Sequence, residues 1–249
     1  MGEGRALPSR AREPSRQTRR SRTVSAASGL PSESVLERQL KAGIRGISVL
    51  DLSSSQITTL STYCRLVAQW NRAYNLIGAR TLPEIVPRHL LDSLVLSNFL
   101  PPDACRILDF GTGAGLPGLP LAVVHPERQF VLLDRSRKKT RFVRQVKLEL
   151  DLPNVEVVTG EVGHYQDNPF ECIMARAVGS LGELVRRSEH LIGAKGVYLF
   201  PKGLNIEREL HELPQGWNAS VMKLEKSTAG SSTRTVVVLR PSDAATEGS

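Results

Sequence analysis

The chain has no apolar run near the roughly 18 residues needed to span a bilayer, and its polar, arginine-rich start has no apolar signal core. It has only three cysteines, Cys64, Cys105 and Cys172, which are odd in number and widely spaced. That spacing excludes a disulfide framework and a C-x-x-C metal or redox site, and it predicts core thiols in a reducing cytoplasm. We therefore expect a soluble cytoplasmic enzyme without a membrane partner. A chain of 249 residues with 40% hydrophobic content can bury one core and carry an accessory segment.

Metal-ligand spacing is also absent. The five histidines are scattered along the chain: His89, His125, His164, His190 and His211. No catalytic nucleophile paired with a base is visible either. We expect no metal ion at the site.

The net charge of +8 is concentrated at the start of the chain. Residues 1–30 hold seven arginines against two glutamates, a net charge of +5, which leaves +3 for the rest. Because this stretch offers little to bury, residues 1–33 are predicted to be a disordered basic tail, and residues 242–249 a second disordered tail. The basic tail could attract phosphates, could be a solvated extension without a role, or could be a transit peptide.

Residues 34–104 are predicted to form a helical N-terminal segment. Capping-box patterns at Ser34-Val-Leu-Glu37 and Ser53-Ser-Ser-Gln56 indicate two helix starts. A third helix is expected to start near Thr81 and Pro83.

Residues 105–241 alternate between strand-like and helical stretches. The expected strands lie near 106–110, 129–133, 154–159, 170–175, 196–200, 217–225 and 233–240. The first five imply parallel strands with right-handed crossovers. The last two are separated by too short a link for a crossover helix and so predict an antiparallel hairpin. We therefore predict an α/β fold of the class I methyltransferase type, a Rossmann-like, mostly parallel seven-stranded sheet that ends in that hairpin.

The first of these strands runs through Asp109 into a glycine-rich turn containing Gly111, Gly113 and Gly115, and the turn leads into a helix. Such a turn brings a ligand against the main chain. The same residues also satisfy the weak dinucleotide pattern G-x-G-x-x-G. The earlier carboxylate, in the pattern D-x-G-x-G-x-G, suits a cationic ligand such as S-adenosylmethionine better than a pyrophosphate. Asp134 ends the next strand, where it could accept hydrogen bonds from ribose hydroxyls of either cofactor.

Several motifs together give the chain a family resemblance: Trp70-Asn71, Tyr74-Asn-Leu76, Arg88-His89-Leu-Leu-Asp92-Ser93, the loop from Asp109 to Pro120, Leu132-Leu-Asp134, Arg141-Phe-Val143, Ala175-Arg176-Ala177 and Lys202-Gly203. The chain resembles the glucose-inhibited division protein B family, guanine-N7 methyltransferases of 16S ribosomal RNA. The resemblance covers about residues 65–205. It implies S-adenosylmethionine as cofactor and the small ribosomal subunit as partner. The implied cofactor contacts are Gly111 and Leu116 in the loop, the pair Val162 and Gly163 after the third strand, and Arg176.

The chain departs from the family pattern at three positions. Gly163 replaces the usual glutamate, and Glu161 stands where the family usually has an arginine. Arg135 replaces the usual serine after Asp134. We expect the adenine to be bound through the backbone near Gly163, and the contact with RNA to differ at Glu161.

Methyl transfer to guanine N7 needs no general base, because this atom has an exposed lone pair and no proton to lose. Positioning is what the protein must supply. His89 and Asp92 stand at i and i+3 and could line the cleft, although a polar surface pair or a helix cap is the alternative. Lys202 ends the fifth strand and could meet an RNA phosphate or the guanine edge, unless it is simply solvated. Arg176 follows the fourth strand and could neutralise the cofactor carboxylate, with a plain salt bridge as the alternative.

The helix after Asp134 carries seven cations before its first acid, Glu149. Arg137, Arg141 and Arg144 share one face of it, which predicts an RNA contact, with a solvated helix as the alternative. We expect a monomer. Three other functions stay open at this point: a methyltransferase for another RNA or a protein, a nicotinamide oxidoreductase, and a non-enzymatic RNA-binding protein with a degenerate cofactor site.

Overall fold

The computed structural model describes residues 1–2, 33–45, 47, 49–77, 89–176, 179–203, 206–224 and 235–242. Most of the two predicted tails, residues 3–32 and 243–249, lies outside this part of the chain. The expected helix start near Thr81 and Pro83 lies outside it as well.

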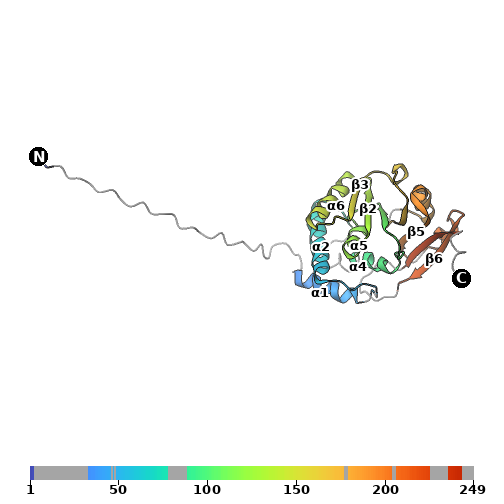
Figure 1. The fold of residues 1–249 in the computed structure, drawn as a ribbon, viewed down its shortest axis with the longest axis horizontal. Helices are drawn as coiled ribbons and strands as arrows, with labels where there is room; N and C mark the ends of the chain where they lie inside the picture. The colour runs from blue at the N-terminus through green and yellow to red at the C-terminus, as the bar shows by residue number, and fades with distance from the viewer. Residues whose placement is uncertain are drawn as a thin grey trace.

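The helical N-terminal segment contains α1 (Glu33–Ile44), α2 (Ser54–Tyr74), the short α4 (Leu91–Leu94) and the 3-10 turn η2 (Val95–Asn98) (Figure 1). The predicted capping box at α2 is confirmed, because the Ser53 hydroxyl accepts from the Gln56 N–H and the Gln56 side chain accepts from the Ser53 N–H. The predicted cap at Ser34 is wrong, because a helix capped by Ser34 would begin at Val35, two residues after the actual start of α1. Helix α1 already includes Glu33, an acid in the first turn that is favourable near the positive end of the helix dipole.

Seven strands form one sheet, in the order β3-β2-β1-β4-β5-β7-β6. Their bounds are β1 Arg106–Phe110, β2 Gln129–Asp134, β3 Val155–Thr159, β4 Phe170–Met174, β5 Ile192–Lys202, β6 Trp217–Lys223 and β7 Thr235–Pro241. Strands β1 to β5 pair in parallel, whereas β7 runs antiparallel to β5 and to β6. The predicted fold class and its terminal hairpin are confirmed.

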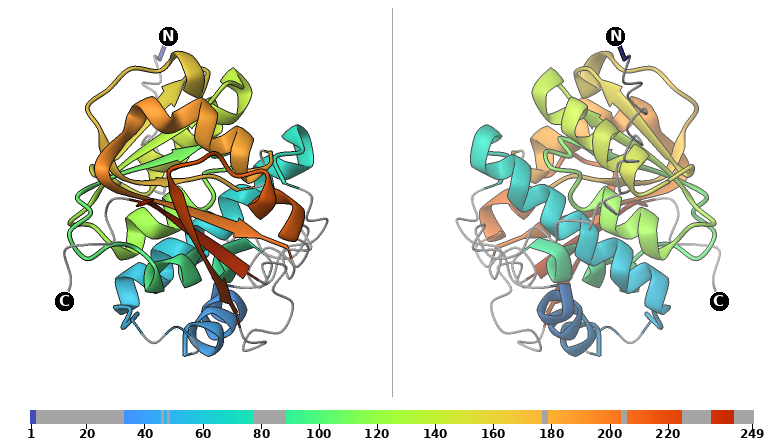
Figure 2. Two further views of the ribbon diagram at one scale, coloured as in Figure 1. Left: turned by 90° about the vertical axis from the view of Figure 1, so that its right-hand side faces the viewer. Right: turned by 90° about the vertical axis from the view of Figure 1, so that its left-hand side faces the viewer.

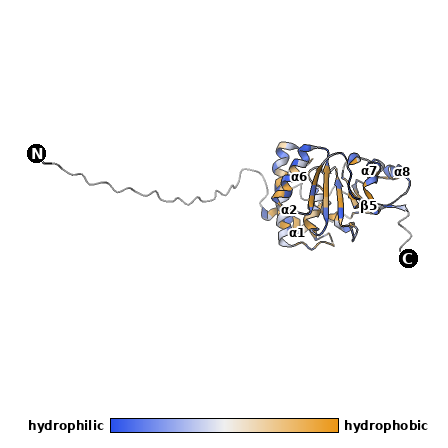
Figure 3. Cartoon of the chain, turned by 45° about the horizontal axis from the view of Figure 1, so that its top comes forward, coloured by the Kyte–Doolittle hydropathy of each residue, from blue (hydrophilic) through white to orange (hydrophobic). Residues whose placement is uncertain are grey.

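Helices cover both faces of this sheet (Figure 2). The elements between the strands are α5 (Gly118–Val124), α6 (Arg137–Glu149), η3 (Val162–His164), α7 (Leu181–Ser188), η4 (Glu189–Leu191) and α8 (Glu207–His211). The pleat sends neighbours to opposite sides, so Ile107 belongs to the core cluster that includes buried residues of α1, α2, α4, α5 and α6, whereas Leu108 belongs to the cluster that includes those of α7 and η3. Figure 3 shows the apolar strands enclosed by helices with polar outer faces.

Two expectations need correction. Cys64 and Cys172 are buried as predicted, but Cys105 is exposed, because it precedes β1 at the amino edge of the sheet. Strand β5 starts at Ile192, four residues before the expected 196. Ile192 pairs with Phe170, and a bulge separates this pair from the rest of the strand. The glycines and Lys195 interrupt the apolar pattern there, so the sequence did not indicate this part of the strand. In the part of the chain described here, no helix is long and apolar enough to cross a membrane.

Candidate cofactor and RNA site

The glycine-rich loop lies at the carboxyl ends of β1 and β2, where Phe110 pairs with Leu133. Gly111, Gly113 and Gly115 have φ angles of 68°, 62° and 85°, a region that side chains disfavour. The positive φ at Gly113 turns its N–H toward Asp134, whose Oδ2 accepts it at 2.9 Å. The Gly111 N–H donates to the Leu133 carbonyl at 2.7 Å. The loop is therefore fastened to the end of β2.

Asp109 is fully buried beneath this loop. Its Oδ2 accepts from the Thr112 hydroxyl at 2.7 Å and from the Gly118 N–H at 2.8 Å, which ties the loop to the start of α5. Its Oδ1 has no hydrogen-bond partner within the described ranges. Burial raises the pKa of this carboxyl from 3.8 to about 7, although both hydrogen bonds and the Arg176 guanidinium oppose the change. An orphaned, buried carboxylate oxygen fits a ligand that brings a cationic donor.

Asp134 ends β2 and is 5% exposed. Besides Gly113, it accepts the Ser136 N–H at 2.8 Å on Oδ1, and Lys139 Nζ lies 3.9 Å from Oδ2. Each carboxylate oxygen has a second lone pair, so Asp134 can still accept from hydroxyl groups of a ligand.

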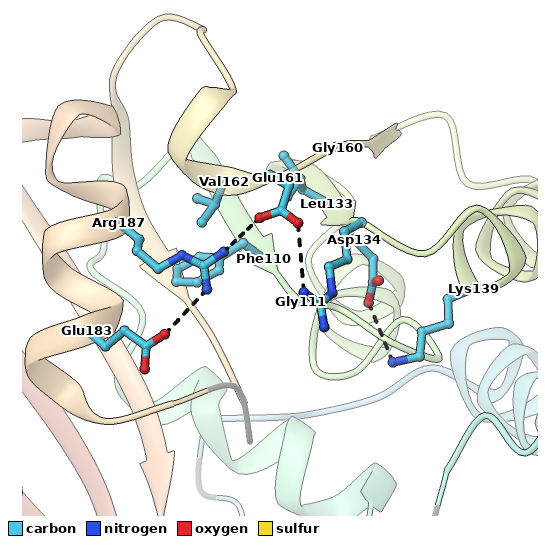
Figure 4. A pocket seen from close by; sticks show the side chains of 11 residues that line it. Phe110, Gly111, Leu133, Asp134, Lys139, Gly160, Glu161, Val162, Glu183 and Arg187 are labelled. Atoms are coloured by element: carbon cyan, nitrogen blue, oxygen red, sulfur yellow. Dashed lines mark hydrogen bonds and ion pairs between the residues drawn. The ribbon is translucent and has the colours of Figure 1, made fainter.

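A cavity of about 340 Å³ opens beside these residues, at the carboxyl ends of β1, β2 and β3 (Figure 4). Its apolar walls are Phe110, Leu133 and Val162. The other lining residues are Gly111, Asp134, Arg135, Lys139, Gly160, Glu161, Glu183 and Arg187. Apolar walls with a carboxylate at one end fit a nucleoside.

The predicted cofactor residues are only partly gathered in this cavity. Gly111, Asp134 and Val162 line it, whereas Leu116 is buried in the core. Gly163 is exposed and is not among the lining residues.

The two charged departures, Arg135 and Glu161, meet at this cavity. Arg135 Nη1 lies 3.8 Å from Glu161 Oε1, and Arg187 Nη2 from α7 lies 3.3 Å from Glu161 Oε2. Arg187 also reaches Glu183 at 3.7 Å, so the charges join the ends of β2 and β3 to α7 (Figure 4). Sequence reasoning missed Arg187 and Glu183, because charges on an exposed helix face give no signal of a distant partner.

The second group of predicted residues surrounds Arg176 after β4. Arg176 Nη1 lies 3.3 Å from His89 Nδ1. Since a guanidinium only donates, His89 Nδ1 is the acceptor and its ring proton lies on Nε2. Burial lowers the pKa of Arg176, and three nearby groups oppose this change: Tyr63, Asp109 and Asp92. The structure thus brings His89 and the buried Asp92 to Arg176, next to Asp109.

Lys202 is partly buried, and its ammonium group has two partners. Its Nζ donates to the Gly179 carbonyl at 2.6 Å and to Glu209 Oε2 at 2.8 Å, and the side chain is 13% exposed. Glu209 Oε2 also accepts the Leu181 N–H at 2.8 Å. Lys202 therefore joins β5 to the starts of α7 and α8, and contact with RNA would need an exchange of these partners.

The three arginines predicted on α6 differ in their contacts. Arg144 donates to the Thr159 hydroxyl at 3.0 Å and to the Val157 carbonyl at 3.1 Å, so it is attached to β3. Arg137 and Arg141 are exposed. Among the residues with described positions, no group of three or more His, Cys, Asp or Glu side chains could hold a metal ion.

Two solved structures share the fold. The O-methyltransferase TomG from Streptomyces achromogenes, solved in complex with S-adenosylmethionine, has a TM-score of 0.52 at 14% identity, over 83% of this chain and 98% of TomG. The glycopeptide N-methyltransferase MtfA, also solved with S-adenosylmethionine, has a TM-score of 0.52 at 10% identity, over 62% of this chain and 94% of MtfA. The fold and the loop geometry define a class I methyltransferase.

The family can be stated more closely. Residues 56–237 match the GidB family model, which describes the rRNA small subunit methyltransferase G. The ribosomal RNA small subunit methyltransferase G of Nitrosococcus oceani is 42% identical over 183 residues, 73% of this chain and 84% of the relative. That of Ectopseudomonas mendocina is 40% identical over 205 residues, 82% of this chain and 95% of the relative. The chain belongs to the rRNA small subunit methyltransferase G family, and the predicted resemblance is confirmed.

Proposed function

We propose that this protein transfers the methyl group of S-adenosylmethionine to N7 of a specific guanine in 16S ribosomal RNA. The assignment of the cofactor is supported by the cavity beside Asp134 and by Oδ1 of the buried Asp109, which has no hydrogen-bond partner within the described residues. Family membership carries the RNA substrate. We further propose that the protein acts as a cytoplasmic monomer.

The residues divide the work of binding the cofactor between them. Asp134 accepts the ribose hydroxyls, and the apolar walls formed by Phe110, Leu133 and Val162 enclose the adenine. The Asp109 carboxylate attracts the cationic amino group of S-adenosylmethionine. The Arg176 guanidinium neutralises the carboxylate of the cofactor. Gly111 leaves the main chain open to the ligand. When bound, the cofactor supplies an electrophilic methyl group on a sulfonium.

The guanine needs no deprotonation, because N7 has a lone pair and no proton. The bond from N7 to the methyl carbon would form as the bond from that carbon to the sulfonium breaks, which would leave a neutral thioether. The protein gains rate by holding N7 in line with that carbon and by excluding water, an effect worth roughly 7 kcal/mol or more. His89 and Asp92 would orient the guanine beside Arg176. His89 would do so as a neutral imidazole with its proton on Nε2.

RNA phosphates are expected at the exposed Arg137 and Arg141 on α6. Arg144 and Lys202 would contribute only after leaving the partners that they have in the free protein. A single-stranded loop is the accessible target, because duplex RNA hides its N7 edge in a deep, narrow groove.

The test is methyl transfer from labelled S-adenosylmethionine to small ribosomal subunits that lack their N7-methylguanine, mapped by chain cleavage at the methylated base. One labelled guanine is the expected result. Gly111→Val serves as the control: it should stay folded by circular dichroism and lose cofactor binding by calorimetry, because φ of 68° excludes a β-branched residue.

Other outcomes would overturn the proposal. Cofactor binding without transfer would indicate another methyl acceptor, an RNA or a protein. Absence of both would favour a non-enzymatic RNA-binding protein with a degenerate cofactor site. If Gly111→Val kept its affinity for S-adenosylmethionine, the cofactor would have to bind away from this loop.

A further inference from the structure

The end of α2 projects beyond the edge of the sheet that carries the cavity. Near its start, Gln56 Nε2 donates to the Val123 carbonyl at the far end of α5, and further along the Tyr63 hydroxyl donates to the Ala114 carbonyl in the glycine-rich loop. Since α5 runs away from that loop, α2 runs from the amino edge of the sheet toward the carboxyl edge. Tyr74 lies 11 residues beyond Tyr63, roughly 16 Å further along the axis. Figure 2 shows this end of α2, in teal, standing out from the body.

A ladder of aromatic rings leads from the core to this exposed end. Phe142 on α6 is fully buried, and its ring lies 5.5 Å from that of the half-buried Trp70, at 57°. The Trp70 ring in turn stacks on Tyr74 at 5.2 Å and 27°. Tyr74 is 37% exposed. The core therefore supports an aromatic ring that faces solvent, in an orientation fixed by Trp70.

One cation lies over this ring, and other cations are exposed on the helix that carries this cation. Lys138 Nζ lies 4.9 Å from the centre of the Tyr74 ring, and Arg137 and Arg141 are exposed on the same helix, α6. The next residue, Lys139, lines the cavity and reaches Asp134 at 3.9 Å. The aromatic end of α2 is thus joined to the candidate cofactor site by the first turn of α6.

We infer that these side chains form a binding surface for a single-stranded nucleotide of the substrate RNA, and we name the surface formed by Trp70, Tyr74, Arg137, Lys138 and Arg141 the Tyr74 platform. The base stacks on Tyr74, Lys138 leaves the ring for the phosphate, and the two arginines follow the backbone. An exposed aromatic ring among cations matches single-stranded RNA, whose unstacked bases offer a π-face and whose phosphates offer charge. This inference rests on the proposed function, and it adds a contact outside the cavity, for a nucleotide next to the target guanine.

The test compares Tyr74→Leu with Tyr74→Trp and Tyr74→Phe, using small ribosomal subunits as substrate. Stacking is worth about 1 to 3 kcal/mol per base, so Tyr74→Leu should raise KM for the subunit at least roughly 5-fold, whereas the aromatic variants stay near the wild type. The kcat at saturating subunit and the Kd for S-adenosylmethionine should not change. Leu148→Ala, an exposed apolar residue at the other end of α6, is the matched control and should leave KM unchanged.

A second measurement places the nucleotide. Small subunits carrying photoreactive 4-thiouridine should crosslink to the peptide containing Tyr74, and Lys138→Gln should reduce the salt dependence of subunit binding. A wild-type KM in Tyr74→Leu, or a loss that Tyr74→Trp does not restore, would overturn the platform. If the wild type binds subunits but methylates none, the proposed function fails, and equilibrium binding by the Tyr74 variants still decides the platform.

Discussion

Asp109→Asn is expected to separate two functions of the Asp109 carboxylate: support of the glycine-rich loop through Oδ2 and binding of the cofactor through Oδ1. Oδ2 accepts from Thr112 and Gly118, whereas Oδ1 has no partner within the described residues. The asparagine carbonyl can keep both hydrogen bonds and place its amide where Oδ1 lies, so the loop should survive. Asp109→Ala removes the acceptor and leaves two donors unsatisfied, which should cost roughly 2 to 4 kcal/mol of unfolding free energy.

The stability of the wild type relative to the asparagine variant should depend on pH. The folded pKa of Asp109 is about 7, above its unfolded value of 3.8, so the folded protein binds more protons between these values. The stability that Asp109 contributes is therefore present below pH 4 and is lost as pH rises toward 7. Between pH 5 and pH 8 the wild type should lose about 2 to 3 kcal/mol relative to Asp109→Asn. Urea unfolding of both proteins at the two pH values measures this difference.

Cofactor binding should show the opposite trend with pH. A cationic amino group near Oδ1 favours the ionised carboxylate, so binding below pH 7 releases a proton, and affinity rises with pH up to about 7. Asp109→Asn should abolish this dependence and weaken binding by roughly 10-fold or more, the value of a charge-assisted hydrogen bond. Calorimetry at pH 6 in two buffers of different ionisation enthalpy counts the released proton.

A matched control and a contradicting result complete this prediction. Thr112→Val removes a donor to Oδ2 but keeps the charge, so its affinity should still depend on pH. If Asp109→Asn bound S-adenosylmethionine as tightly as the wild type at every pH, Oδ1 would not face the cofactor, and Asp109 would serve the loop alone.

Three further predictions concern charged groups. Arg135→Ser and Glu161→Gln, alone or together, should each change the unfolding free energy by less than about 0.5 kcal/mol in urea, because both side chains are exposed; a double-mutant coupling above about 1 kcal/mol would contradict this. Lys202→Met should lower the unfolding free energy by roughly 1 to 3 kcal/mol in the same assay, because it leaves Glu209 without its partner. Adding Glu209→Met to this variant should restore part of the loss. Unchanged stability of Lys202→Met with a raised KM for subunits would instead indicate that Lys202 contacts RNA. Removal of residues 1–30, with their net +5, should weaken subunit binding mainly at low salt, and an unchanged salt slope would show that the tail has no role in binding.

The sheet and the loop could be predicted because both depend on local patterns. Apolar runs bounded by turns indicated the strands, and the short link after residue 225 indicated the hairpin. The capping box at Ser53 depends on residues three apart, so the sequence alone reveals it. The same reasoning failed at Cys105, since a single residue beside a strand end carries no periodicity that would tell core from surface.

The charged part of the site could not be predicted in this way. Arg135 and Glu161 stand 26 residues apart and meet only because β2 and β3 are neighbours with aligned carboxyl ends. Lys202 was expected to face RNA or solvent, yet it donates a hydrogen bond to Glu209. The residues between them do not indicate that the chain brings Glu209 back to Lys202. Charged side chains are usually solvated, so their sequence pattern does not specify which opposite charge the fold will bring near.

Asp109 also explains why the loop pattern alone left two cofactors open. A G-x-G-x-x-G turn can hold a pyrophosphate, provided that no negative charge lies beneath it. Here a buried carboxylate lies beneath the turn, and its free oxygen is not satisfied by the loop donors that occupy Oδ2. A pyrophosphate would bring two like charges together in a desolvated site, whereas a cationic amino group would supply the missing donor. The position of one aspartate, two residues before the first glycine, therefore discriminates between the cofactors more sharply than the three glycines do.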